Sequence, residues 1–151
     1  MLIQYRGIYH DRLDAPFVGS LIFARDCHHH CPGCCHEDRH TKYLLEATPE
    51  SIIKEVLEYK FSTGVIFGGF EWTEQIDDLY ALLDCATNNG LSIMLYTHYD
   101  KSELVELYPR LYTYHGLYIK YGEYRRDFHQ DGYTSCGVPL ASTNQYIEQV
   151  P

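Results

Sequence analysis

The stretch Cys27-His28-His29-His30-Cys31-Pro32-Gly33-Cys34 carries three cysteines at C-x₃-C-x₂-C spacing. The apolar run Ser20-Leu21-Ile22-Phe23-Ala24 comes shortly before it, so the pattern predicts that one β-strand delivers all three thiols on a single loop. Because thiolates are the protein ligands of iron–sulfur clusters and of many zinc sites, this loop predicts a metal or cluster site.

The number of regularly spaced thiols bears on whether the loop binds an iron–sulfur cluster or zinc. Most iron–sulfur clusters have four cysteine ligands, whereas the next cysteine here, Cys35, adjoins Cys34, and adjacent side chains do not easily reach the same cluster. A four-iron cluster on this loop would therefore keep one iron open, as catalytic metal sites do. The alternative is a zinc knot, whose remaining ligands would come from Cys35, His28, His29, His30 and His36. Zinc ligands usually come as two separated pairs, so the spacing favours the open cluster and leaves the histidines in a solvated loop.

Bulk properties exclude several classes of function. The length predicts a single domain, 1–151, that needs no metal in order to fold. A net charge of −9 argues against a nucleic-acid partner, since only Arg125 and Arg126 stand together as a basic pair. No secretory signal and no membrane span of about 20 apolar residues is seen, so we expect a cytoplasmic protein with reduced thiols. The cysteines outside the spaced set are expected to be free thiols: Cys35, Cys85 and Cys136.

Strands and helices are expected to alternate along the chain. Thr48-Pro49-Glu50 has the N-cap, first-turn proline and acid of a helix start, Thr73 is expected to cap a second helix, and Asp100 with Glu103 predicts a capping box for a third. The expected strands are residues 2–5, at an edge, and residues 18–24, 65–67, 91–97 and 116–121. Glycine and proline breaks predict irregular structure before residue 18 and after residue 121.

Such alternation predicts a parallel sheet with right-handed crossovers, in which catalytic groups gather at the carboxyl ends of the strands. The cysteine loop, Gly68-Gly69 and Tyr96-Thr97-His98 each follow a predicted strand, so we expect them to share one edge of the sheet. A complete eight-stranded β/α barrel needs about 250 residues. The chain is therefore expected to form a partial, truncated barrel with a mainly parallel open sheet.

These motifs resemble the radical S-adenosylmethionine (SAM) superfamily, whose signature is C-x₃-C-x₂-C on the loop after the first barrel strand. Within it, Cys31-Pro32-Gly33-Cys34 is similar to one branch, the activating proteins of anaerobic (class III) ribonucleotide reductase. Gly68-Gly69 resembles the Gly-Gly-acidic motif of that branch, and Leu95-Tyr96-Thr97-His98-Tyr99 resembles its aromatic-Thr-Gly-Tyr segment. Leu140-Ala141-Ser142-Thr143-Asn144-Gln145 resembles its C-terminal Gly-Ser-Ser-Asn-Gln segment.

The resemblance implies a [4Fe-4S] cluster bound by Cys27, Cys31 and Cys34, with SAM on the open iron. The reduced cluster would cleave SAM, and the resulting 5′-deoxyadenosyl radical would take a hydrogen atom from a glycine of the reductase. The implied protein substrate is thus a glycyl radical enzyme, the anaerobic ribonucleotide reductase. The expected electron donor is a flavodoxin-type or ferredoxin-type protein.

The resemblance also implies a SAM-binding role for six further residues. Gly33 would lie near the adenine, Gly68 and Gly69 would bind the methionine portion, and Glu71 its amino group; Thr97 and Asn144 would line the pocket. The alternative in each case is a local structural role, such as loop geometry, a turn, a helix N-terminal acid or a bond to the backbone.

The chain departs from the branch pattern at three places. Phe70 stands where the acidic residue is expected, with Glu71 one place later; His98 replaces a glycine; and Ala141-Ser142 stands in place of the first Gly-Ser. These departures keep open a radical SAM enzyme that acts on another peptide or small molecule. The cysteines also leave open a non-catalytic zinc-binding module.

Overall fold

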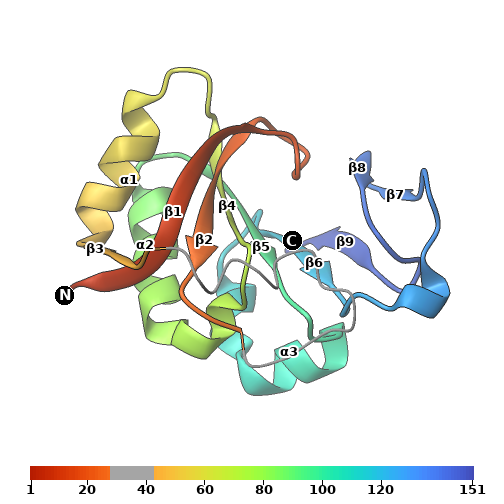
Figure 1. Ribbon diagram of the computed structural model, residues 1–151. Helices are drawn as coiled ribbons and strands as arrows, with labels where there is room; N and C mark the ends of the chain where they lie inside the picture. Colours follow the sequence, from red (N-terminus) through yellow and green to blue (C-terminus); the bar gives the residue numbers. More distant parts are fainter. Residues whose placement is uncertain (28–42) are drawn as a thin grey trace.

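A seven-stranded sheet with the strand order β3-β1-β2-β4-β5-β6-β9 is the centre of the fold (Figure 1). The computed structural model describes residues 1–27 and 43–151. The strands of the sheet are β1 (Ile3–Arg12), β2 (Gly19–Ala24), β3 (Leu45–Ala47), β4 (Gly64–Gly68), β5 (Ser92–Tyr96), β6 (Tyr118–Tyr121) and β9 (Tyr146–Gln149). A separate hairpin, β7 (Thr134–Ser135) with β8 (Val138–Pro139), stands away from the sheet in Figure 1.

The four strands β2, β4, β5 and β6 are parallel to one another, and the outer pairings of the sheet are antiparallel. Every residue of β2 and β4 is buried, as is typical of strands in the middle of a parallel sheet. The predicted α/β class and the parallel centre are therefore confirmed. The sheet is more mixed than predicted, because β1, β3 and β9 run against their neighbours.

The main helices are α1 (Pro49–Glu58), α2 (Ile76–Asn88) and α3 (Lys101–Leu107), and short 3₁₀ helices are η2 (Trp72–Gln75), η3 (Pro109–Thr113) and η4 (Arg126–Phe128). Helices α1 and α2 pack on each other beside the sheet (Figure 1). The predicted cap of α1 is confirmed, since the Thr48 hydroxyl accepts a hydrogen bond from the Ser51 amide at 3.1 Å. The predicted capping box between Asp100 and Glu103 is also present.

Two local predictions are wrong. Thr73 does not cap a helix: it lies inside η2, and Glu71 is the capping residue, because its carboxylate accepts from the Thr73 amide. The first strand is not a short edge strand over residues 2–5, since β1 continues to Arg12 between β3 and β2. A register shift between Tyr5 and Gly7 lets β1 pass the glycine, which has a φ of 147°.

The expectation of irregular structure after residue 121 is also wrong, because β9 pairs with β6 and adds a strand to the sheet. The core of the sheet and helices includes Trp72, Phe67 and Met94, all fully buried. Within the residues that the structure describes, no helix has the length and apolar character to cross a membrane.

Candidate cluster and ligand site

The strand register brings the predicted site segments to one edge of the sheet. Phe23 of β2 lies beside Gly68 of β4, so the chain leaves β2 toward Cys27 next to the glycine pair. On the other side, Tyr96 of β5 lies beside Lys120 of β6. Since β9 runs antiparallel to β6, the residues just before β9 return to this same edge.

The backbone before Cys27 is held from two sides. Arg6 of β1 donates from Nε to the Arg25 backbone oxygen at 2.8 Å, and its guanidinium lies 3.3 Å from an oxygen of the Asp26 carboxylate. The Glu71 amide donates to the Asp26 backbone oxygen at 3.2 Å. Cys27 itself is half-buried and packs against the core. The first predicted ligand thus leaves the sheet from a fixed point.

The remaining predicted cluster residues lie outside the described residues. These are Cys31, Cys34 and Gly33, together with Cys35 and the histidines at 28–30. Across residues 1–27 and 43–151, no group of three or more histidine, cysteine or acidic side chains could hold a metal ion. The assignment of cluster ligands therefore stays a prediction from the sequence.

Close packing within the chain gives a physical reason for both glycines at the end of β4, Gly68 and Gly69. A Cβ atom at Gly69 would lie 2.4 Å from the Phe23 ring, and the residue has a φ of 79°, which glycine alone adopts readily. A Cβ atom at Gly68 would lie 3.0 Å from a methyl group of Leu21. The predicted contact of these glycines with a ligand stays a prediction beside this structural role.

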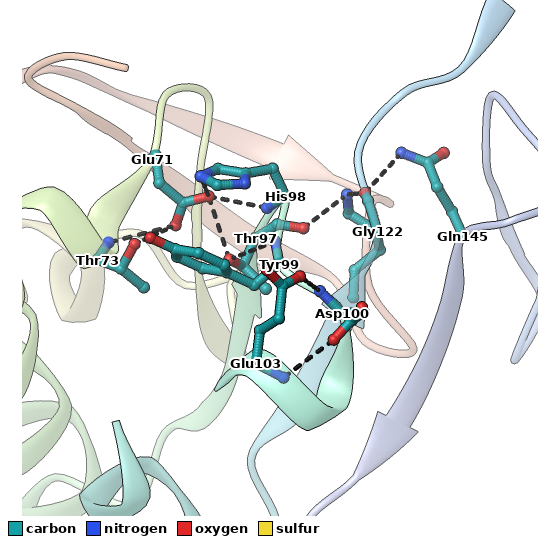
Figure 2. A network of polar contacts seen from close by, with 10 residues as sticks. Glu71, Thr73, Thr97, His98, Tyr99, Asp100, Glu103, Gly122 and Gln145 are labelled. Atoms are coloured by element: carbon teal, nitrogen blue, oxygen red, sulfur yellow. Dashed lines mark hydrogen bonds and ion pairs between the residues drawn. The ribbon is translucent and has the colours of Figure 1, made fainter. Parts of the chain in front are cut away.

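The Glu71 carboxylate is the centre of a polar network between the ends of β4 and β5 (Figure 2). Its Oε2 atom accepts from the hydroxyl of Thr73 at 2.8 Å and from the Thr73 amide at 3.3 Å. Its Oε1 atom accepts from the His98 amide at 2.8 Å and from the Thr97 hydroxyl at 3.1 Å, and the His98 Nε2 atom lies 3.6 Å away. With 3% of its surface exposed, Glu71 is a buried charge satisfied by the chain itself.

A buried lysine that sequence reasoning missed holds the neighbouring strand ends together. Lys120 of β6 is only 7% exposed. Its Nζ atom donates to the backbone oxygens of Thr97, at 3.1 Å, and Gly122, at 2.8 Å. The same atom lies 5.5 Å from the centre of the Tyr96 ring, a cation–π distance. A lysine within an otherwise apolar strand was the available signal, because a buried cation requires partners.

Tyr96 is held at the same place by its hydroxyl, which donates to the Asp14 backbone oxygen at 2.5 Å. Burial raises the pKa of Tyr96 above its usual value, and the negative charge of Asp14 adds to the effect. The phenol therefore stays neutral at physiological pH.

A cavity of about 610 Å³ opens beside these strand ends. Its lining is rich in charged and polar residues: His98, Asp100, Glu103, Gly122, Glu123, Arg125, Asn144 and Tyr146. Gly122 has a φ of 97°, and a Cβ atom there would lie 3.1 Å from the Asn144 backbone oxygen. The Gln145 side chain donates to the Gly122 backbone oxygen at 3.2 Å, which closes the segment 141–145 onto the strand end.

Asn144 has an unsatisfied acceptor in this cavity wall. Its side-chain Nδ2 donates to the Glu123 backbone oxygen at 2.8 Å, whereas its Oδ1 atom is buried and has no hydrogen-bond partner among the described residues. A buried acceptor without a partner is costly, and a ligand that brings a donor would remove that cost. The predicted pocket residues Thr97 and Asn144 thus lie on the two strand ends that flank Gly122.

A half-buried thiol just past the carboxyl end of a parallel strand, within a C-x₃-C-x₂-C stretch, is compatible with an iron–sulfur protein. The model of the 4Fe-4S single cluster domain family matches residues 16–145, and the chain belongs to that family. Comparison with curated proteins gave no match. Family membership supports an iron–sulfur cluster over the zinc knot.

Proposed function

We propose that this protein is a radical SAM activase. It would cleave SAM reductively at a [4Fe-4S] cluster bound by Cys27, Cys31 and Cys34, and generate a glycyl radical on an anaerobic ribonucleotide reductase. One observation carries the proposal: three features lie at the same edge of the sheet. These are the end of β2 that leads to Cys27, the glycine pair at the end of β4, and a ligand-sized cavity beside β5 and β6. Family membership supports the cluster.

The donor and charge pattern of the cavity fits SAM. The cavity is within the size range of small-molecule sites, about 300–1,000 Å³. Three carboxylates line it, from Asp100, Glu103 and Glu123, against one guanidinium, so a ligand with a sulfonium and an ammonium group would complement its charge.

When bound, the reduced cluster and SAM supply the one-electron chemistry that removes a hydrogen atom from the substrate. The contribution of the chain is binding, orientation and exclusion of water. Gly68 and Gly69 let Leu21 and Phe23 pack closely against the end of β4, which fixes this strand end beside the segment that leads to Cys27. Lys120 and Gln145 fix the Gly122 carbonyl, and through it the cavity wall.

The proposed domain is a truncated radical SAM β/α barrel, of which the described residues form an open sheet with β3 and β9 at its edges. An open barrel would leave room for a large protein to reach the reacting centre. This supports a protein substrate, and a flavodoxin-type or ferredoxin-type donor would deliver the electron.

Anaerobic reconstitution with iron and sulfide, followed by dithionite and SAM, tests the first half of the proposal. The expected product is 5′-deoxyadenosine, and a fully loaded protein that releases none would exclude radical SAM activity. Electron paramagnetic resonance after incubation with the reductase tests the second half. A glycyl doublet is expected; SAM cleavage without that doublet would instead favour another peptide or a small molecule as the substrate.

A further inference from the structure

Two of the departures of this chain from the branch pattern, at Phe70-Glu71 and at His98, touch each other. Glu71, displaced by one place through Phe70, accepts a hydrogen bond from the His98 amide at 2.8 Å. The imidazole of His98, which replaces a glycine, lies with Nε2 at 3.6 Å from the same carboxylate oxygen (Figure 2). Phe70 itself is buried edge-on against Phe23, with ring centres 4.9 Å apart. The displaced acid and the added imidazole therefore form one unit.

Within this unit the carboxylate is already occupied by the chain. A carboxylate offers about four acceptor positions, and Glu71 accepts from the amide and hydroxyl of Thr73, the hydroxyl of Thr97 and the amide of His98. Its side chain is 3% exposed. An ammonium group of a ligand would have to displace one of these donors.

His98 is the member of the unit that reaches the cavity. It lines the cavity, and its side chain is 20% exposed. The charged groups around it are the Glu71 carboxylate behind the ring and, in the cavity wall, Asp100, Glu103, Glu123 and Arg125. A ring N–H of the imidazole can donate a hydrogen bond into the cavity, whereas the carboxylates around it offer acceptors.

We propose, on the basis of the proposed function, that His98 is the side chain that binds the α-carboxylate of SAM. Glu71 is then a positioning residue: it orients the imidazole and fixes the β5 end instead of binding the α-amino group. A carboxylate offers about four acceptor positions, so one of them would be available for this contact. His98 would thus supply a recognition group that a glycine at this place lacks.

The test compares SAM with decarboxylated SAM, which lacks only the carboxylate. Dissociation constants are measured by anaerobic equilibrium dialysis on the reconstituted, unreduced protein, so that no turnover occurs. Wild type is expected to prefer SAM. His98→Gly should lower this preference at least about tenfold, the size expected for one charge-assisted hydrogen bond. Circular dichroism checks that each variant is folded, and His98→Gln provides a second variant of similar size.

Arg125→Gln tests the competing partner for the carboxylate, because Arg125 supplies the guanidinium of the cavity wall; it should lower the preference less than His98→Gly does. Arg110→Gln is the matched control: Arg110 is paired with Asp84 at 3.0 Å outside the cavity lining, and its replacement should leave the preference unchanged. Glu71→Gln should lower the preference in the presence of His98 and have little further effect in the His98→Gln background, a coupling that a purely structural role would not produce.

The outcomes distinguish a failure of the proposed function from a failure of the inference about His98. A loaded wild-type protein that does not bind SAM overturns the proposed function, and this inference with it. SAM binding with the same carboxylate preference in wild type, His98→Gly and His98→Gln overturns the inference alone. A loss of preference in Arg125→Gln but not in the His98 variants would assign the carboxylate to Arg125 and equally overturn it.

Discussion

The Nζ atom of Lys120 lies 3.1 Å from the backbone oxygen of Thr97 and so ties the end of β5 to β6. It also donates to the Gly122 oxygen at 2.8 Å. Lys120→Met keeps the aliphatic chain but leaves the Thr97 carbonyl without this donor, so we expect a loss of about 1–3 kcal/mol in the free energy of unfolding. Urea denaturation followed by circular dichroism measures it.

Lys54→Met is the control for this prediction. Lys54 is an exposed lysine whose Nζ atom lies 4.0 Å from Glu58, and its replacement should change stability by less than about 0.5 kcal/mol. Equal losses in the free energy of unfolding for the two variants would contradict the stabilising role assigned to the Lys120 hydrogen bonds.

Gly69→Ala should destabilise the protein more than Gly90→Ala. Both glycines have positive φ, 79° and 73°, so both variants incur a backbone cost of about 1–2 kcal/mol. A Cβ atom at Gly69 would also meet the Phe23 ring, whereas one at Gly90 meets nothing within 4 Å. An additional loss of about 1–3 kcal/mol at Gly69 is expected in parallel denaturation curves. Indistinguishable curves would mean that the Phe23 contact is unimportant.

Cys27→Ser should abolish cluster binding. Serine is a poor ligand for the iron of a cluster that has only three thiolates, so iron and sulfide content and the brown absorbance should fall to near background after anaerobic reconstitution. Cys85→Ser is the matched control, because Cys85 is a half-buried thiol on α2 whose Sγ atom lies 3.9 Å from the Asn89 amide nitrogen. It should retain full iron content, and full loading of the Cys27 variant would refute the ligand set.

Stability should fall as the pH rises from 10 to 12, in part because of Tyr114. Burial and a hydrogen bond to Asp84 raise the pKa of Tyr114 to about 12. Below pH 10 the phenol is neutral in both the folded and unfolded states, so its contribution to stability is complete. Above pH 10 the unfolded chain loses this proton first, which favours unfolding.

Tyr114→Phe should therefore flatten the decline in melting temperature between pH 10 and pH 12, although it is less stable at pH 7 through the lost hydrogen bond. The control is Tyr43→Phe, whose side chain is exposed and should leave the profile unchanged. Parallel profiles for wild type and the Tyr114 variant would disprove the assignment.

Local signals in the sequence predicted local structure well. The capping box at Asp100 and Glu103 involves residues three apart, and it is present. The buried strand at β4 is bounded by its own glycines, and it too is present. In contrast, the sequence did not predict β9. Tyr146 of β9 pairs with Tyr121 of β6, and nothing in the residues around Tyr146 indicates that partner.

The same difference between local sequence signals and long-range contacts applies to the candidate site. The alternation of strands and helices predicts that Gly68, Thr97 and the residues leading to Cys27 share one edge, and the strand register agrees with this. The engagement of Glu71 with Thr97 and His98 could not be predicted, because it depends on how a turn after β4 faces the end of β5, 26 residues later. The orientation of side chains that are so far apart in the sequence depends on tertiary packing, and the spacing of residues along the chain does not determine it.

The cavity wall formed by residues 141–145 has a consequence for biogenesis. The other side chains of the cavity, from His98 to Glu123, leave the ribosome before Asn144 and Gln145 are made. A nascent chain therefore presents an incomplete cavity until synthesis has passed residue 145 and Gln145 can donate to the Gly122 oxygen. A ligand of this cavity would meet its complete wall only after that point.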